Sequence, residues 1–355
     1  MRVILKDKFN LVFVLLVFYI GISFANVYGR EEKSGSDSSA PESEALRFKS
    51  TETKGEYKFD TGIIRGTLRS EGKSRGLSEV IYLPKKIQID GSLGLFGFYR
   101  IFAGHRRFGA ALWGRASAAQ LLPEGAVKVV WPAEKECPFE LTAIYRLLNA
   151  ASVDLEIMVK PSGDLPTFEV FLASYFHEDF PSSYIYVQKE VSQDASGAEF
   201  VEAGTWGGKW QMYPRDKQVI AMIKDGRWQQ EPHPVDWDIR ECLAAPVGMR
   251  RHAKSGLSVV LMARPEDCFA IATPYTKETH YSQYLSLFGR NLYKDKTIHA
   301  HTRLLFTWEL SDAGILQEYQ KFILETKDEC DFALSPVGYS DIIVRKGLGK
   351  AIVDF

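Results

Sequence analysis

A histidine followed by two carboxylates, His177-Glu178-Asp179, ends a strand-like stretch over residues 167–176. Imidazole gives and takes a proton near neutral pH, which suits it to general acid–base catalysis. Because side chains alternate along a strand, His177 is expected on the same side as Ala173 and Tyr175. The alternative is a solvated strand end, where polar residues are common. His177 is therefore the first candidate catalytic residue.

The stretch over residues 232–238, with the sequence Pro-His-Pro-Val-Asp-Trp-Asp, joins a histidine, two carboxylates and a tryptophan. Loops carry binding and catalytic groups more often than cores do. A tryptophan such as Trp237 can stack on the ring of a ligand, while Asp236 or Asp238 can accept a proton or a hydrogen bond. The alternative is a rigid connector shaped by its two prolines. Asp236 is the second catalytic candidate, and His233 and Trp237 are candidate substrate-binding residues.

A local positive cluster, His105-Arg106-Arg107, lies in a Gly-bounded stretch over residues 104–109. A guanidinium grips sugar hydroxyls or the carboxylate of a uronic acid through two parallel hydrogen bonds. The alternative is a solvated hairpin turn. His105, Arg106 and Arg107 are therefore candidate substrate-binding residues.

Two histidines, His299 and His301, alternate along another strand-like stretch and face the same side. Such a pair chelates a metal ion when a third ligand converges, and Glu278 or His280 could supply it. An exposed polar strand face is the favoured interpretation, and we predict no metal site. The sequence contains no Gly-rich phosphate loop, nucleophile elbow, HExxH or EF-hand pattern, so no cofactor is expected.

The composition narrows the class of partner. The formal net charge is −1, and lysines and arginines are spread along the chain without a basic stripe, so nucleic acid is not an expected partner. Aromatic residues make up 13% of the chain, which fits either a sheet protein or a surface that stacks on sugar rings.

The four cysteines, at positions 137, 242, 268 and 330, are widely spaced and form no CxxC pair. This spacing does not indicate a compact zinc site. The sequence is compatible with isolated thiols and with a single disulfide. Cys242 with Cys268 is the preferred disulfide pair, because both residues lie in strand-like stretches of one region.

Residues 1–25 have the features of a secretory signal peptide: a positive start, an uncharged stretch over 9–24, and the small-x-small sequence Ser-Phe-Ala at 23–25. The alternative is an uncleaved anchor, although the apolar stretch is shorter than the ~20 residues that span a bilayer. Residues 26–50 are predicted to be a disordered linker. We expect export to the periplasm or the extracellular space, with membrane contact only if the leader is retained.

The folded part, residues 51–330, shows a dominant hydrophobic period of two, which predicts strands. The clearest case is Val153–Lys160, where apolar and charged residues alternate. Further strands are predicted over 62–68, 79–89, 97–102, 127–131, 139–147, 167–175, 184–191, 218–224, 257–263, 269–273, 281–288 and 298–306, and long loops over 206–214 and 228–237. Turn signals between them predict an antiparallel all-β sandwich or barrel. A helix is expected over 312–327 as a cover on the outside of the sheets, followed by an extension over 331–355.

The order of several motifs resembles the galactose mutarotase-like (aldose epimerase-like) superfamily. The stretch 104–109 is similar to the strand and loop beside that family's sugar site, and the hairpin of 139–147 with 153–160 is similar to its central strand pair. The stretch 166–176 follows as the next strand, and 285–290 with 298–308 match its late strands. The resemblance covers about half of the chain and implies an antiparallel β-supersandwich with a face suited to sugars.

The sequence departs from this family at the positions that carry its chemistry. Ala173 stands where the resemblance places a catalytic histidine. The late segment that should hold a general-base glutamate has Tyr281, Tyr284 and Ser286 instead. Mutarotation needs one group to protonate the ring oxygen and another to take the hydroxyl proton. The resemblance therefore implies the fold and a carbohydrate ligand, and leaves enzymatic activity open.

Three functions follow from these observations. The first is a carbohydrate-directed enzyme of the epimerase type outside the cytoplasm, and the second is a glycan-binding module without catalysis, which Ala173 favours. The third is a structural or assembly module of the cell envelope. Convergence of His105, Arg107, His177 and a tryptophan on one surface would favour the first two.

Overall fold

The computed structural model describes residues 46–70, 76–109, 111–192, 195–204, 210–275, 279–308 and 311–333. The predicted signal peptide, most of the predicted linker, and residues 334–355 of the predicted extension lie outside these ranges. Phe48 is buried and the first strand begins at Lys49, so the folded domain begins slightly before the predicted boundary at residue 51.

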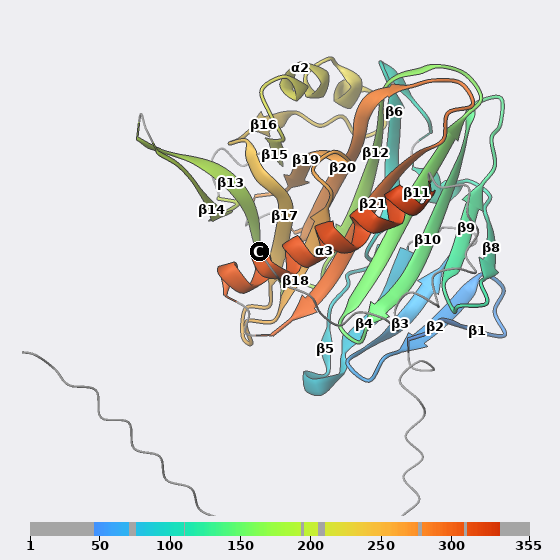
Figure 1. The fold of residues 1–355 in the computed structure, drawn as a ribbon, viewed down its shortest axis with the longest axis vertical. Helices are drawn as coiled ribbons and strands as arrows, with labels where there is room; N and C mark the ends of the chain where they lie inside the picture. The colour runs from blue at the N-terminus through green and yellow to red at the C-terminus, as the bar shows by residue number, and fades with distance from the viewer. Residues whose placement is uncertain are drawn as a thin grey trace, which may run out of the picture. The chain divides into compact units, whose positions relative to one another are not determined.

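The described chain forms three sheets (Figure 1). A five-stranded sheet has the order β1 (Lys49–Ser50), β2 (Glu56–Asp60), β3 (Ile64–Arg69), β4 (Gly76–Tyr82), β5 (Ile87–Gln88). A nine-stranded sheet has the order β14 (Ala195–Glu202), β13 (Ser182–Ser192), β17 (Leu243–Arg251), β18 (Ser258–Ala263), β21 (Ile298–Thr307), β11 (Ser152–Pro161), β10 (Phe139–Asn149), β9 (Val127–Trp131), β8 (Ala118–Leu121).

A seven-stranded sheet completes the set, in the order β16 (Trp237–Ile239), β15 (Trp210–Pro214), β19 (Cys268–Thr273), β20 (Ser282–Leu292), β12 (Leu165–Tyr175), β6 (Gly97–Ala103), β7 (Arg106–Arg107). Among the described strand pairs, β15 with β16 is parallel and the others are antiparallel. The helices are α2 (Val219–Ile223) and α3 (Asp312–Ala333), with short 3₁₀ turns η1 (Leu83–Lys85), η2 (Leu112–Gly114) and η4 (Arg227–Gln229).

One apolar core joins the three sheets. Ile64 comes from the five-stranded sheet, Ile157 and Leu261 from the nine-stranded sheet, and Leu172 and Leu285 from the seven-stranded sheet. All five side chains are at most 1% exposed. The all-β sandwich predicted from the period-two pattern is therefore confirmed, because alternation places one row of side chains of each strand inside.

The C-terminal helix covers the outer face of the nine-stranded sheet (Figure 1). Ile315, Tyr319 and Phe322 follow the helical repeat and pack on Met249 and Val260 of β17 and β18. The helix predicted over 312–327 is confirmed, and it continues to Ala333. None of the described helices is long and apolar enough to cross a bilayer.

Several local predictions are wrong. The segment predicted as a strand over 218–224 contains the helix α2, because a short apolar run does not distinguish a helix from a strand. The helix is also favoured locally, since the Asp216 carboxylate accepts hydrogen bonds from the backbone N–H groups of Gln218 and Val219 at its start. The strand predicted over 79–89 is interrupted by η1, which contains Pro84. The loop predicted over 206–214 contains β15, which lies against β19.

The preferred disulfide is also wrong, because Cys137, Cys242 and Cys268 are free thiols. Cys268 lies in β19 of the seven-stranded sheet, and its side chain is fully buried in the main core. Cys242 directly precedes β17 of the nine-stranded sheet. Their similar strand context in the sequence did not reveal that the two residues belong to different sheets.

Candidate functional site

The seven-stranded sheet has a second face, turned away from the main core, that is rich in aromatic side chains. Phe102 of β6, Phe171 and Tyr175 of β12, and Tyr284 of β20 lie on this face and are each at most 6% exposed. Residues 215–240, which contain α2, η4 and β16, cover part of it, and we call this segment the cap. The face that the family resemblance assigns to sugars is therefore partly occupied by the chain itself.

Two tryptophans attach the cap to this face. The ring centroid of Trp228 lies 4.9 Å from Phe102 and 4.6 Å from Phe171, and Trp237 lies 5.1 Å from Trp228. Both tryptophans are more than nine-tenths buried. Aromatic side chains of this size dominate the energy of a packed surface, so the two rings hold the middle and the end of the cap.

A buried ion pair attaches the cap at a second point. The Arg227 guanidinium lies 3.2 Å from the Glu169 carboxylate and 2.8 Å from that of Asp225, and it donates to the Thr167 carbonyl. Ser286 donates to the other Glu169 oxygen at 3.1 Å. Burial raises the pKa of Glu169 to about 7, although Arg227 and Ser286 act to lower it.

Sequence reasoning missed this pair. The available signal was Glu169 itself, which is a charged residue within an otherwise apolar stretch of the predicted strand. Such a residue needs a buried partner, because an unpaired carboxylate is costly to remove from water. The partner lies 58 residues later in the chain, and only the folded structure identifies it.

Two arginines hold the 230–233 loop of the cap. Arg107 Nη1 donates to the carbonyls of Gln230 and Pro232, at 3.3 and 2.6 Å. Arg100 Nη2 donates to the His233 carbonyl at 2.6 Å. Gln230 also donates through its side chain to the carbonyl of His105. The structure thus brings together the two stretches that the sequence singled out separately, 105–107 and 232–238.

Further aromatic side chains continue the face beyond Trp237. Trp210 lies 6.1 Å from Trp237, 5.5 Å from the His280 ring and 6.3 Å from Tyr284. Trp210 is half-buried and His280 is exposed, so this part of the face reaches solvent. A hollow of about 490 Å³ lies on the cap itself, and both Asp236 and Trp237 line it.

The other candidates lie elsewhere. The chain leaves β12 at Tyr175, and the His177 imidazole pairs with Asp179 at 3.2 Å, while the His252 ring lies 4.0 Å from the same carboxylate. The expectation that His177 continues the row of Ala173 and Tyr175 fails because the strand has ended. Arg106 lies over the Phe108 ring and pairs with Glu136 at 3.5 Å.

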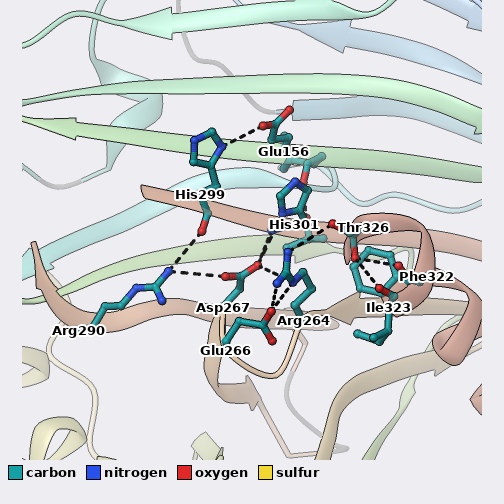
Figure 2. A network of polar contacts seen from close by, with 12 residues as sticks. Glu156, Arg264, Glu266, Asp267, Arg290, His299, His301, Phe322, Ile323 and Thr326 are labelled. Carbon is teal, nitrogen blue, oxygen red and sulfur yellow. Dashed lines mark hydrogen bonds and ion pairs between the residues drawn. The ribbon is translucent and has the colours of Figure 1, made fainter. Parts of the chain in front are cut away.

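His299 and His301 belong to a polar network on the outer face of the nine-stranded sheet (Figure 2). His299 pairs with Glu156 at 3.1 Å, and the His301 ring lies 3.8 Å from Asp267, whose carboxylate also accepts the His301 backbone N–H. Arg290 lies 3.7 Å from Asp267. No three His, Cys, Asp or Glu side chains in the described ranges are placed to hold a metal ion.

Comparisons with known proteins concern the fold alone. No protein-family profile matches the chain, and no curated protein sequence matches it. A candidate aldose 1-epimerase from Escherichia coli K12 is 11% identical, with a TM-score of 0.40 over 71% of this chain and 99% of its own. A GalM/aldose epimerase homologue from Caenorhabditis elegans is 8% identical, with a TM-score of 0.43 over 72% of this chain and 99% of its own.

A larger enzyme is similar over part of its length. The α-N-acetylgalactosaminidase of Bifidobacterium bifidum is 10% identical, with a TM-score of 0.43 over 78% of this chain and 39% of its own. The first two proteins are of the epimerase type that the sequence resembles. At these identities no activity or residue role is transferred to this chain.

The buried ion pair predicts a large effect of Arg227→Met. This change leaves Glu169 buried without its cation, so we expect a loss of about 3 kcal/mol in the free energy of unfolding, measured by urea denaturation. Arg215→Met is the matched control, since it breaks the exposed pair with Asp216 and should cost less than about 1 kcal/mol. Similar small losses in both variants would contradict the assigned role of Arg227.

The outer network predicts a pH dependence of stability. Burial acts to raise the pKa of Glu156, but the His299 hydrogen bond and the charge of Arg146 outweigh it and lower the pKa from 4.5 to about 2. A lowered folded-state pKa gives stability that is present above about pH 5 and is lost as the pH falls toward 2. Between pH 5 and 2, wild type should lose up to about 3 kcal/mol more than Glu156→Gln in urea titrations. Equal losses would show that Glu156 contributes nothing.

Proposed function

We propose that this protein binds carbohydrate, including glycans that carry uronic acids, at the junction of the cap and the seven-stranded sheet. The observation that carries the proposal is that Arg107 holds the 230–233 loop of the cap beside the aromatic face to which Trp237 belongs. An aromatic ring provides the apolar face on which a sugar stacks, and nearby guanidinium and imidazole groups bind its hydroxyls. The family resemblance of the sequence points to the same sheet.

The geometry favours binding without mutarotation. Ala173 is fully buried between Phe171 and Tyr175 on the aromatic face, and it offers no proton. Glu169 lies on the same strand, but it is 1% exposed and paired with Arg227 beneath the cap. The acid and base that the epimerase reaction needs are therefore not both presented to a ligand.

An exposed carboxylate supports a second candidate function. Asp236 is exposed and lines the same hollow as Trp237, where it could serve as a base toward a bound sugar. This arrangement is the basis for an epimerase-type enzyme as the alternative.

Carbohydrate binding is tested with purified protein and a panel of neutral and acidic sugars, by calorimetry and by proton NMR of anomer exchange. We expect binding without faster exchange, and about tenfold weaker binding for Trp237→Leu, because a ring contact of about 1.5 kcal/mol is lost. Trp308→Leu is the matched control, since Trp308 stacks on Tyr82.

The outcomes of this experiment separate the functions. Absence of binding across the panel, or equal losses in the two tryptophan variants, would overturn the proposal. Because Trp237 is buried, His233→Ala provides a second variant at an exposed residue. Accelerated anomer exchange that Asp236→Asn abolishes would establish the enzyme instead.

We also propose that the protein is exported, on the basis of the charge and apolar pattern of residues 1–25. Mass spectrometry of the secreted form should show a mature chain that begins at Asn26. Recovery of the intact leader in the membrane fraction would indicate an anchor, and recovery of the intact chain from the cytoplasm would contradict export.

A further inference from the structure

Arg100 is a buried cation, and some of its hydrogen-bond donors are unused. It is 2% exposed, and its guanidinium carbon lies 4.9 Å from the centroid of the Tyr99 ring and 5.1 Å from that of Trp228. Its Nη2 donates to the His233 carbonyl at 2.6 Å and lies 3.3 Å from the Tyr99 hydroxyl. Within the described part of the chain, its buried Nε and Nη1 have no hydrogen-bond partner. A buried guanidinium with two unused donors lacks an acceptor that it could bind.

Arg107 places a second positive charge beside the first. Burial and the positive charge of Arg100 lower the pKa of Arg107, while Glu231 and Tyr99 act in the opposite direction. The hydrogen bonds described above join its guanidinium to the neutral carbonyls of Gln230 and Pro232. Two guanidinium groups that hold the same loop repel each other, and an anion bound between them relieves that repulsion.

Other buried arginines of the protein have more acceptors than Arg100 has. Arg227 pairs with Glu169 and Asp225, and Arg303 pairs with Asp154 at 2.6 Å and with Glu325 at 2.8 Å. Arg100 instead uses backbone and hydroxyl oxygens in the described structure. Arg250, which is also buried, donates to three backbone carbonyls, whereas both acceptors of Arg100 in the described structure lie on its Nη2.

The cap loop that these arginines hold is open to solvent. Glu231, Pro232, His233 and Pro234 are all exposed, and the guanidinium–carbonyl bonds join this loop to β6 and β7. An anion that reaches the site can replace these carbonyls, because its full negative charge attracts a guanidinium more strongly than the partial charge of a carbonyl oxygen does. Before a ligand binds, the loop carbonyls thus occupy the positions that the oxygens of the ligand would take.

We infer that Arg100 and Arg107 form a subsite for the carboxylate of an acidic sugar, whose ring lies against the aromatic side chains beside the 231–234 loop. This inference rests on the proposed carbohydrate function and narrows its ligand to uronic acids. The carboxylate is planar and matches the paired donors of a guanidinium, and it supplies the acceptor that Arg100 Nε and Nη1 lack. Binding moves the 231–234 loop away from Arg107.

The test compares methyl galacturonoside with methyl galactoside, which differ in the carboxylate, by calorimetry on the full chain. We expect the uronoside to bind about ten- to hundredfold more tightly, as a hydrogen-bonded charge contributes about that factor. Its advantage should shrink as salt rises, since salt screens accessible charges. Hydrogen exchange at residues 231–235 should increase with the uronoside and stay unchanged with the galactoside.

Arg107→Gln should remove most of the preference for the uronoside, because one of the two guanidinium groups of the subsite is lost. Arg65→Gln is the matched control, because Arg65 is an exposed arginine on β3, and it should keep the preference. Arg107→Lys keeps the charge and should retain part of the preference, which separates loss of the cation from loss of the fold.

Each outcome has a distinct meaning. Equal affinity for both glycosides would overturn the carboxylate subsite and leave the carbohydrate function in place. Binding of neither glycoside, nor of any sugar in the wider panel, would overturn both proposals. Tighter binding of galactose 6-sulfate than of the uronoside, or binding of acetate alone with the affinity of the uronoside, would also overturn the assignment to a uronic acid.

Discussion

The buried ion pair between Arg227 and Glu169 is the constraint on which the candidate site depends. It fixes the cap to the strand that runs through the middle of the aromatic face, at a position closed to water on all sides. A buried pair gives little net stability compared with apolar packing, but breaking it is costly, so it specifies one placement of the cap. Trp228, the next residue, is thereby directed onto Phe171.

The cap changes what the aromatic face can do. Trp228 occupies part of the surface on which a ligand ring could stack, and another part, around Trp210 and His280, reaches solvent. The cap also contributes new groups, because it carries His233, Asp236 and Trp237 to the edge of the sheet. A ligand therefore meets the cap and the sheet together, and the reactive carboxylate of the strand, Glu169, is used for structure.

The arginines of the molecule divide according to their partners. Arg227 and Arg303 are held by carboxylates and fix the cap and the outer helix, whereas Arg100 holds a loop through a neutral oxygen. The histidines divide similarly, since His299 and His301 are engaged with Glu156 and Asp267 on the outer sheet face. Most of these charged side chains, which in the sequence could be taken for parts of a functional site, therefore serve to hold the fold together.

The sequence by itself determined the all-β class, the alternation of Val153–Lys160 and the outer helix, because each follows from a local hydrophobic period. It also singled out the stretches 105–107 and 232–238 from their residue types. Only the tertiary structure decided that these stretches meet, that His177 lies beyond the strand end and pairs with Asp179, and that Glu169 pairs with Arg227. The reason is physical: contacts between residues far apart depend on strand order and on where each strand ends, and neither leaves a periodic signal in the chain.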